Sequence, residues 1–333
     1  MKKYILKNKI KIIILFLIIS LVRCGSEFET LLDSRDERLP AGVYWVESEG
    51  TVNYINFDRT GRKTIYTSLN PTPFYVDIDV YGNKVYWTAV SGTSYQIKTV
   101  KLDGTSKEDL YSYPVSSGFG PLSIAIDEVN SSILWSYYQN ASLHHDIWKA
   151  EIFSEPWVPV KWVPTINHYC MYSICVDSIN RKIYYTSNTY YEIAAFDRGS
   201  GNSGSVYIGP LDAAASNYEQ KISDVGPAGN STPFKGIAVD GAGGYVYYVF
   251  INASSAINIM RANLSLSSFV SWITAGSYNI EKIALDLKHR KIYWTSNYLS
   301  QYRIYRADLD VSNSNVEIFL TLDNPPTGIA IQQ

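Results

Sequence analysis

The chain has 333 residues, of which 46% are hydrophobic, 14% aromatic and only 18% charged, and its formal net charge is −2 at pH 7. Its first 23 residues hold six basic residues and no acidic one, so the remainder carries 23 Lys and Arg against 31 Asp and Glu, a net charge of −8. This balance argues against nucleic acid and anionic membrane surfaces as partners. The many tyrosines (28) and tryptophans (8), without helical periodicity, are typical of an all-β exported protein.

The N-terminus has the organisation of an export signal. Five lysines lie between Lys2 and Lys11, and an apolar run of eleven residues follows from Ile12 to Val22. That run is too short to span a bilayer comfortably and has the length of a signal-peptide apolar region. The sequence therefore predicts a signal peptide over residues 1–23.

Cys24 directly follows the apolar run, with Gly25 and Ser26 behind it. This arrangement resembles the lipobox of bacterial lipoproteins, in which the cysteine is diacylated and becomes the first residue. Leu21 fits the lipobox pattern and Arg23 departs from it. We expect lipidation at Cys24 and a polar tether over residues 24–41. Signal cleavage nearby and an uncleaved anchor are the alternatives.

One phrase then recurs along the chain: an aliphatic strand ending in Asp, followed seven positions later by an aromatic-rich strand. The intact copies are Val76–Asp79 with Tyr86-Trp87, Ile124–Asp127 with Leu134-Trp135, Ile174–Asp177 with Tyr184-Tyr185, Ile237–Asp240 with Tyr247-Tyr248, and Ile283–Asp286 with Tyr293-Trp294. A sixth copy is split, with Tyr44-Trp45 near the start and Ile329–Gln332 at the end. The phrase predicts an all-β fold, a six-bladed β-propeller with four-stranded blades over residues 42–333.

The split copy predicts how the ring closes. Strands from Val43–Val46, Val52–Phe57 and Lys63–Tyr66 would form the outer part of the first blade, and the C-terminal segment Gly328–Gln332 would supply its innermost strand. We therefore expect the last residues to be essential to the whole core.

The segments Ile283–Ser296 and Ile174–Ser187 resemble the YWTD repeats of low-density-lipoprotein-receptor propellers. The best matches are Tyr86-Trp87-Thr88, Tyr184-Tyr185-Thr186 and Tyr293-Trp294-Thr295. The closing Asp of that motif is replaced by Ala89, Ser187 and Ser296, and two copies lack the Thr, with Ser136 and Val249 in its place. The resemblance covers about residues 42–333 and implies six blades, but a shared fold does not carry a shared function. With the lipobox-like leader it suggests a bacterial cell-envelope protein, an outer-membrane or surface lipoprotein, or alternatively a periplasmic or secreted protein.

Five aspartates have the same position in the sequence repeat, at the end of each aliphatic strand: Asp79, Asp127, Asp177, Asp240 and Asp286. A ring of carboxylates could bind a cation. The interpretation we favour is that each accepts backbone N–H groups in its own turn. His144 or His145 with His168 lacks a third ligand at diagnostic spacing. The sequence predicts no metal site and no cofactor.

A further group of aromatic residues is expected near the mouth of the ring: Phe74, Tyr75, Phe119, Trp157, Trp162, Tyr169, Tyr172, Phe234 and Tyr278. Two long insertions, Ser154–His168 and Leu211–Thr232, are expected to open on the same face, and long loops on a rigid scaffold often carry recognition. The alternative is that these aromatic residues plug the channel or pack between blades.

The functional hypothesis is an exported, lipid-anchored propeller, a monomer, that binds a protein or glycan ligand through this aromatic face and meets the membrane only through its N-terminal lipid. No nucleophile elbow, phosphate-binding loop, zinc-binding HExxH or CxxC pair is found, so nothing supports an enzyme. The alternatives are a periplasmic metal-dependent hydrolase of the lactonase type and a structural envelope scaffold.

Overall fold

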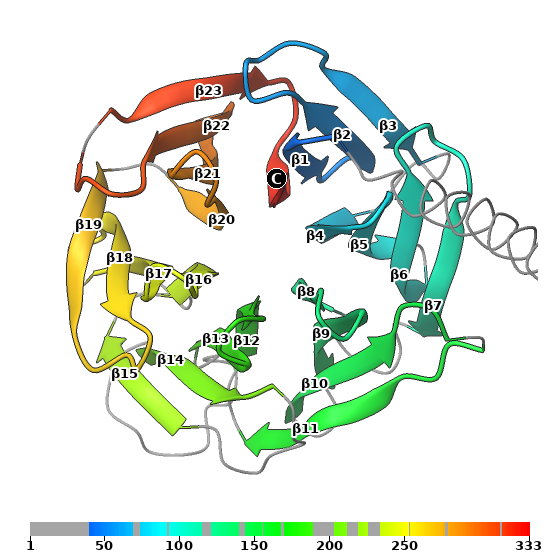
Figure 1. The fold of residues 1–333 in the computed structure, drawn as a ribbon, viewed down its shortest axis with the longest axis horizontal. Helices are drawn as coiled ribbons and strands as arrows, with labels where there is room; N and C mark the ends of the chain where they lie inside the picture. Colours follow the sequence, from blue (N-terminus) through cyan, green and yellow to red (C-terminus); the bar gives the residue numbers. More distant parts are fainter. Residues whose placement is uncertain are drawn as a thin grey trace, which may run out of the picture.

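The computed structural model describes residues 40–68, 74–91, 93–114, 121–139, 144–154, 156–167, 170–188, 203–211, 219–225, 234–252, 254–276, 279–313 and 315–333. The predicted signal peptide and Cys24 lie outside these residues. Within them, every regular element is a β-strand, and no helix is long and apolar enough to cross a membrane. The strands radiate around a central axis, so the prediction of an all-β propeller is confirmed (Figure 1).

In the described part of the chain the strands pair into six four-stranded antiparallel sheets. One sheet combines the two ends of the described chain, in the order β24 (Pro326–Gln332), β1 (Gly42–Glu47), β2 (Thr51–Ile55) and β3 (Lys63–Thr67). The next sheets are β4 (Phe74–Tyr81), β5 (Lys84–Ser91), β6 (Ser94–Lys101), β7 (Glu108–Pro114); β8 (Ile124–Asp127), β9 (Ser132–Gln139), β10 (His144–Glu151), β11 (Val160–Asn167); and β12 (Cys170–Asp177), β13 (Lys182–Asn188), β14 (Ser203–Pro210), β15 (Glu219–Val225). The last are β16 (Phe234–Asp240), β17 (Tyr245–Ile251), β18 (Ile257–Asn263), β19 (Phe269–Gly276); and β20 (Ile280–Asp286), β21 (Lys291–Tyr298), β22 (Gln301–Asp308), β23 (Glu317–Leu322).

The C-terminal strand β24 is the innermost strand of the first sheet (Figure 1). It pairs with β1 so that Ile329 lies opposite Trp45 and Ala330 opposite Tyr44. These four side chains are at most 5% exposed. Residues from the two ends of the described chain therefore share one sheet and the hydrophobic clusters on both of its faces.

The repeated phrase becomes one repeated contact in the structure. In every sheet the same aliphatic position of the innermost strand faces a large aromatic residue on the second strand: Ile329 with Trp45, Ile78 with Trp87, Ile124 with Trp135, Ile174 with Tyr185, Ile237 with Tyr248, and Ile283 with Trp294. All six aromatic side chains are at most 1% exposed. Burial of rings of this size between neighbouring sheets dominates the core, which is why the aromatic pair recurs.

The register of β4 differs from that of the other innermost strands, and this corrects one prediction. The two-residue turn Gly82-Asn83 joins β4 to β5, whereas four residues join β8 to β9. Asp79 therefore pairs with Tyr86 in mid-strand, while Asp127 pairs with Ser132 at the strand end. Asp79 does not share the position of the turn aspartates. It stands where the other innermost strands have small residues: Ala125, Cys175, Ala238, Ala284 and Ala330.

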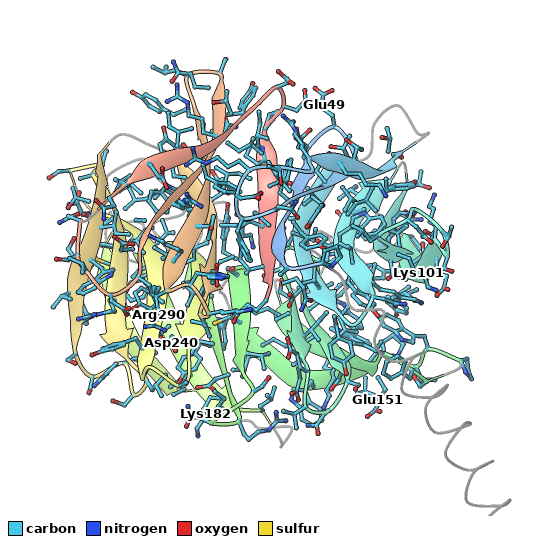
Figure 2. All side chains as sticks on the ribbon, turned by 45° about the horizontal axis from the view of Figure 1, so that its top comes forward. Glu49, Lys101, Glu151, Lys182, Asp240 and Arg290 are labelled. Carbon is cyan, nitrogen blue, oxygen red and sulfur yellow. The ribbon has the colours of Figure 1, made fainter. Side chains whose placement is uncertain are left out.

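The antiparallel pairing defines two ends of the ring. We call "turn end" the end where the innermost strands finish and short turns such as 128–131 lead to the second strand, and "loop end" the end where the innermost strands begin. Figure 2 shows Glu49, which follows β1, at the loop end, and Glu151, Lys182 and Asp240 at the turn end. The connection between the third and fourth strand of each sheet lies at the turn end for the same reason.

Candidate functional site

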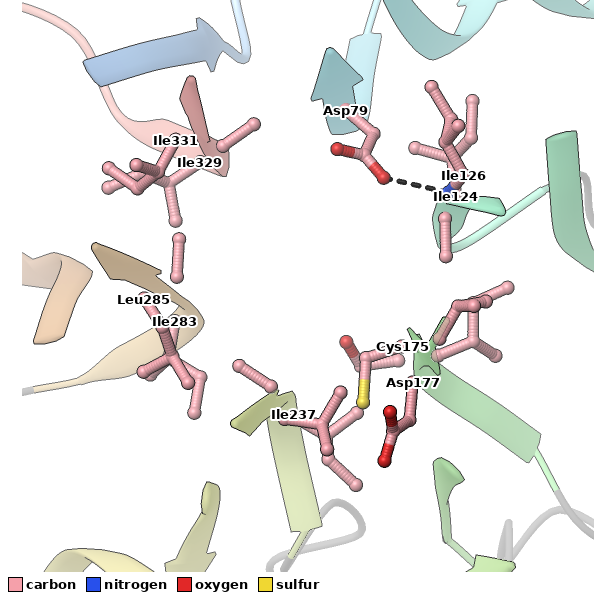
Figure 3. A pocket seen from close by; sticks show the side chains of 18 of the residues that line it. Asp79, Ile124, Ile126, Cys175, Asp177, Ile237, Ile283, Leu285, Ile329 and Ile331 are labelled. Carbon is pink, nitrogen blue, oxygen red and sulfur yellow. Dashed lines mark hydrogen bonds between the residues drawn. The ribbon is translucent and has the colours of Figure 1, made fainter. Parts of the chain in front are cut away.

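The innermost strands enclose a central cavity of about 510 Å³ (Figure 3). Many of its lining side chains are aliphatic, among them Ile126, Val176, Leu285 and Ile331 from four different sheets, and polar side chains and backbone groups complete the wall. The cavity runs from Asp77 and Lys282 inside the ring to Glu128, Ser178 and Gln333 at the turn end. Its volume lies within the size range of small-molecule sites.

A buried lysine closes the cavity toward the loop end. Lys282 on β20 reaches across the ring, and its Nζ donates to Asp77 Oδ2 on β4 at 2.9 Å. The same ammonium approaches Ser173 Oγ at 3.3 Å and the carbonyl oxygens of Leu122 and Tyr172 at 3.4 and 3.3 Å. The side chains of Lys282 and Asp77 are only 6% and 7% exposed. This ion pair therefore bridges two sheets that are separated by the first sheet, whose innermost strand β24 contacts both β4 and β20.

Asp77 completes its hydrogen bonding with groups of β4 and of the neighbouring sheet. Its Oδ2 also accepts from Ser123 Oγ at 2.6 Å and from the Ile124 backbone N–H at 3.2 Å, and its Oδ1 accepts from the Ile78 N–H at 3.0 Å. Ser123 Oγ in turn accepts from the Ile174 N–H at 3.0 Å. A fully hydrogen-bonded network of this kind rigidifies a core, and here it joins four innermost strands, β4, β8, β12 and β20.

Asp79 is the second carboxyl group of the cavity and has a different environment. Its two oxygens accept the backbone N–H groups of Val80 and Ile126, each at 2.8 Å (Figure 3 shows the second bond). Among the described residues no cationic side chain forms an ion pair with it. Burial raises the pKa of Asp79 to about 7 against the opposing effect of the two N–H groups, with smaller contributions from Glu128 and Asp77.

The turn aspartates have the structural role that we favoured. Asp177 accepts the backbone N–H groups of Ile179 and Asn180 at 3.1 and 2.9 Å, and Asp240 accepts that of Gly243 at 2.7 Å. The other two are held by Asn130 and Arg181 (Asp127) and by His289 (Asp286). The predicted turn role is thus confirmed for four of the five aspartates, and Asp79 is the exception.

Two arginines use these aspartates to link neighbouring sheets at the turn end. Arg181 makes a bidentate contact of 2.7 Å with Asp127, and Arg290 reaches Asp240 at 2.8 Å. Burial disfavours the charge of Asp127, but hydrogen bonding and the charge of Arg181 outweigh it and lower the pKa of this carboxyl. Among the described residues, no group of three or more His, Cys, Asp or Glu side chains is arranged to hold a metal ion.

The predicted aromatic face is described only in part. Phe119, Tyr169 and Tyr278 lie outside the described residues, as does His168. Phe74 and Tyr75 begin β4, and His144 and His145 begin β10, all with side chains that are not described. The structure therefore places four members of the predicted set: Trp157, Trp162, Tyr172 and Phe234.

Trp157 does not lie where the sequence analysis placed it. It follows β10 in the connection to β11, at the turn end, and its ring stacks on Trp135 at 5.9 Å between centroids with an interplanar angle of 6°. Residues 160–167 of the supposed insertion form β11. The expectation of a loop opening at the ring mouth is corrected here, because the inserted segment carries the outer strand of its own sheet.

Phe234 belongs to the core, and Trp162 is partly buried and packs against the core. Phe234 is 1% exposed and packs on Tyr248 and Phe250 with ring centroids 5.8 and 5.0 Å away. Trp162 lies on the outer strand β11, with Lys149 4.4 Å above its ring. Both side chains point between sheets, as the alternating geometry of a strand requires of a large apolar residue. Their expected place on an exposed rim is corrected.

Of the two placed members at the loop end, Phe234 is buried and Tyr172 remains partly exposed. Its hydroxyl donates to Glu281 Oε2, and Lys235 Nζ donates to Glu281 Oε1 at 2.7 Å and to Asn279 Oδ1 at 2.8 Å. We call Tyr172, Lys235, Asn279 and Glu281 the Tyr172 cluster. It lies above Lys282, whose Nζ is 5.5 Å from the centre of the Tyr172 ring.

This cluster was not predicted from the sequence, although a signal for it was present. Tyr172, Lys235 and Glu281 each stand two residues before the repeated isoleucine of their strand. Polar residues at one repeated position on three consecutive sheets must approach one another where the strands converge. Lys282, directly before Ile283, carries the same kind of signal.

No protein-family model matches the sequence, and no curated protein matches it. Solved structures do resemble it. A chain of a nidogen/laminin complex has a TM-score of 0.64 at 14% identity, covering 88% of this chain and 98% of that chain. TolB from Acinetobacter baumannii gives 0.62 at 11% identity, covering 87% and 66%, and a putative TolB from Agrobacterium tumefaciens gives 0.60 at 12% identity, covering 87% and 92%. Similarity at these identities shows the β-propeller fold.

Proposed function

We propose that this protein is an exported, lipid-anchored, six-bladed propeller that binds a protein partner through its loop end. The observation that carries the proposal is the closure of the channel by Lys282. Because its ion pair with Asp77 lies just below the Tyr172 cluster, a ligand arriving at the loop end meets polar and aromatic side chains before it could reach the cavity. Such a surface suits contact with another macromolecule better than enclosure of a small molecule.

The position of Pro40 also supports partner binding at the loop end. The described chain starts at Pro40, and β1 begins at the turn end, so a tether anchored through Cys24 would attach there. The loop end would then face away from the membrane. Leu299 follows β21 at this end and is 78% exposed, a large apolar side chain available for contact. The nidogen chain with a similar fold was crystallised with laminin, so the shared architecture is compatible with protein binding.

Two other functions remain as alternatives to be tested. A lactonase-type hydrolase would hold a metal in the channel through acidic and amide side chains of the innermost strands. In the described channel Asp77 is committed to Lys282, which disfavours that arrangement. A stoichiometric divalent ion that survives dialysis, together with lactone hydrolysis, would replace our proposal. A purely structural scaffold would show no partner that depends on the loop end, and glycan binding would appear on a glycan array.

The binding proposal predicts different effects for matched substitutions at the two ends. Tyr172→Ala with Leu299→Ala removes two loop-end contacts, and we expect the affinity for a partner cross-linked from cell-envelope extract to fall roughly thirtyfold, as truncation of an interface anchor commonly costs about 2 kcal/mol. Ile179→Ala with Lys288→Ala is the control, because Ile179 is 66% exposed and both residues lie in turns at the turn end. Biolayer interferometry on folded variants makes the comparison. Equal losses from both pairs would refute binding through the loop end.

The anchor proposal is tested separately. Cys24 follows the apolar run directly, so acylation there would attach the propeller to a membrane. Cys24→Ser is expected to abolish metabolic labelling with a palmitate analogue and to move the protein from the detergent phase to the aqueous phase. Retention in the detergent phase would indicate an uncleaved signal anchor instead.

A further inference from the structure

The ring has one chemical asymmetry in its cavity. At the position of Asp79 the other innermost strands carry Ala125, Cys175, Ala238, Ala284 and Ala330. The two-residue turn after β4 shifts the strand register and brings a carboxyl group to this position. The remaining wall at this level is small and apolar, so Asp79 faces the cavity without a polar side-chain neighbour at the equivalent positions.

The charges that line the cavity are unbalanced. Its lining includes the carboxyl groups of Asp77, Asp79, Glu128 and Asp177, against the single ammonium of Lys282. Lys282 is already paired with Asp77, and Asp177 is held by its own turn. Glu128 is exposed at the turn end, where the cavity opens. The site therefore favours a positively charged guest.

We propose that the channel is a binding site for a small organic cation, an amine on an apolar skeleton, which enters from the turn end and places its ammonium group at Asp79. The aliphatic walls from Ile126, Val176, Leu285 and Ile331 would surround the skeleton. This site is independent of the proposed partner surface, because the Lys282–Asp77 pair separates the cavity from the loop end.

The carboxylate of Asp79 has unused hydrogen-bond acceptor capacity for the ammonium group of such a ligand. Each oxygen accepts one backbone N–H, and an ionised carboxylate has about four acceptor sites. A buried carboxylate without a counter-ion is costly, and the free protein responds with a pKa of Asp79 raised to about 7. An ammonium group at Asp79 would supply the missing counter-charge and a charge-assisted hydrogen bond.

The test compares three probes with the same hydrocarbon chain: hexylamine, hexanol and hexanoate. Saturation-transfer NMR on the full chain is expected to show hexylamine binding about tenfold more tightly than hexanol, with no binding of hexanoate. Asp79→Asn keeps the shape of the side chain and should reduce hexylamine binding to the level of hexanol. Asp323→Asn removes the same charge from an exposed position outside the cavity and should leave binding unchanged.

The pH dependence gives a second readout. Hexylamine stays protonated below about pH 10, like a lysine side chain. Asp79, with a pKa of about 7, is mostly neutral at pH 6 and mostly ionised at pH 8, so hexylamine affinity should rise roughly tenfold over this interval. The other titratable groups that line this space are Asp77, Glu128, Cys175, Asp177 and Lys282. Comparison with Asp79→Asn, which should lose the rise, isolates Asp79.

Several outcomes would overturn the proposal. They are equal binding of hexylamine and hexanol, unchanged binding in Asp79→Asn, or no binding of hexylamine at 10 mM to the folded protein. If Asp79→Asn does not fold, Asp79→Ala replaces it, because alanine occupies the equivalent position on four of the other innermost strands. Partner binding at the loop end is measured on the same variants and should be unchanged, so failure of either proposal is recognised separately.

Discussion

Deletion of Pro326–Gln333 is expected to abolish cooperative folding. The deletion removes all of β24, the innermost strand of the first sheet, whose backbone pairs with β1 from Gly42 to Glu47. It also removes Ile329 and Ala330, each 5% exposed, and uncovers Trp45. An unpaired inner edge and open faces on two neighbouring sheets leave apolar surface that the remaining strands cannot cover. We expect loss of the near-ultraviolet circular dichroism signal and of a sigmoidal thermal transition.

The control for this deletion is removal of Gln333 alone, which is exposed and follows the strand. That variant should unfold within a few degrees of the intact protein. A Pro326–Gln333 deletion that kept a cooperative transition near the original temperature would contradict closure of the ring by β24.

Lys282→Met is expected to lower the free energy of unfolding by about 3–5 kcal/mol, because removing one partner of a buried ion pair leaves the other charge uncompensated. Asp77 would keep its bonds to Ser123 and Ile124, which places the effect toward the lower part of this range. Methionine retains most of the apolar length of lysine, so the change reports on the charge. Urea unfolding followed by tryptophan fluorescence measures the loss.

A double-mutant cycle separates the ion pair from other effects. Asp77→Asn with Lys282→Met should cost clearly less than the sum of the two single changes, since neither charge is then left alone. Lys288→Met is the matched control on an exposed lysine just after β20, with an expected effect within about 0.5 kcal/mol. Additive single effects, or a loss below about 1 kcal/mol for Lys282→Met, would contradict an energetic bridge across the ring.

Asp79 shows that equal spacing in the sequence does not guarantee an equivalent position in the structure. The seven-residue spacing from Asp79 to Tyr86 equals that from Asp286 to Tyr293, so the sequence alone presents the two aspartates as equivalent. The strand pairing separates them, because a two-residue turn replaces a four-residue turn and shifts β4 by two positions. A shift of two keeps the same face of the strand, so the hydrophobic pattern carries no trace of it.

The burial of the predicted aromatic residues could not be read from the sequence either. Phe234 and Trp157 are large residues near expected loops, and the sequence alone does not distinguish an exposed position at the ring mouth from a buried one in the core. Phe234 packs in its own sheet on Tyr248 and Phe250, and Trp157 stacks on Trp135. Their burial depends on which strands flank them, and a segment assigned to a loop contains β11.

The sequence by itself indicated the propeller fold and the turn role of four of the five aspartates, because the repeated phrase and each turn span only about a dozen positions. Only the tertiary structure decided the cavity, its closure and its charge. Asp77 and Lys282 are 205 residues apart, and Tyr172 and Glu281 are 109 apart. Strands from different sheets converge at the axis, so the chemistry there is set by contacts across the ring that no local pattern encodes.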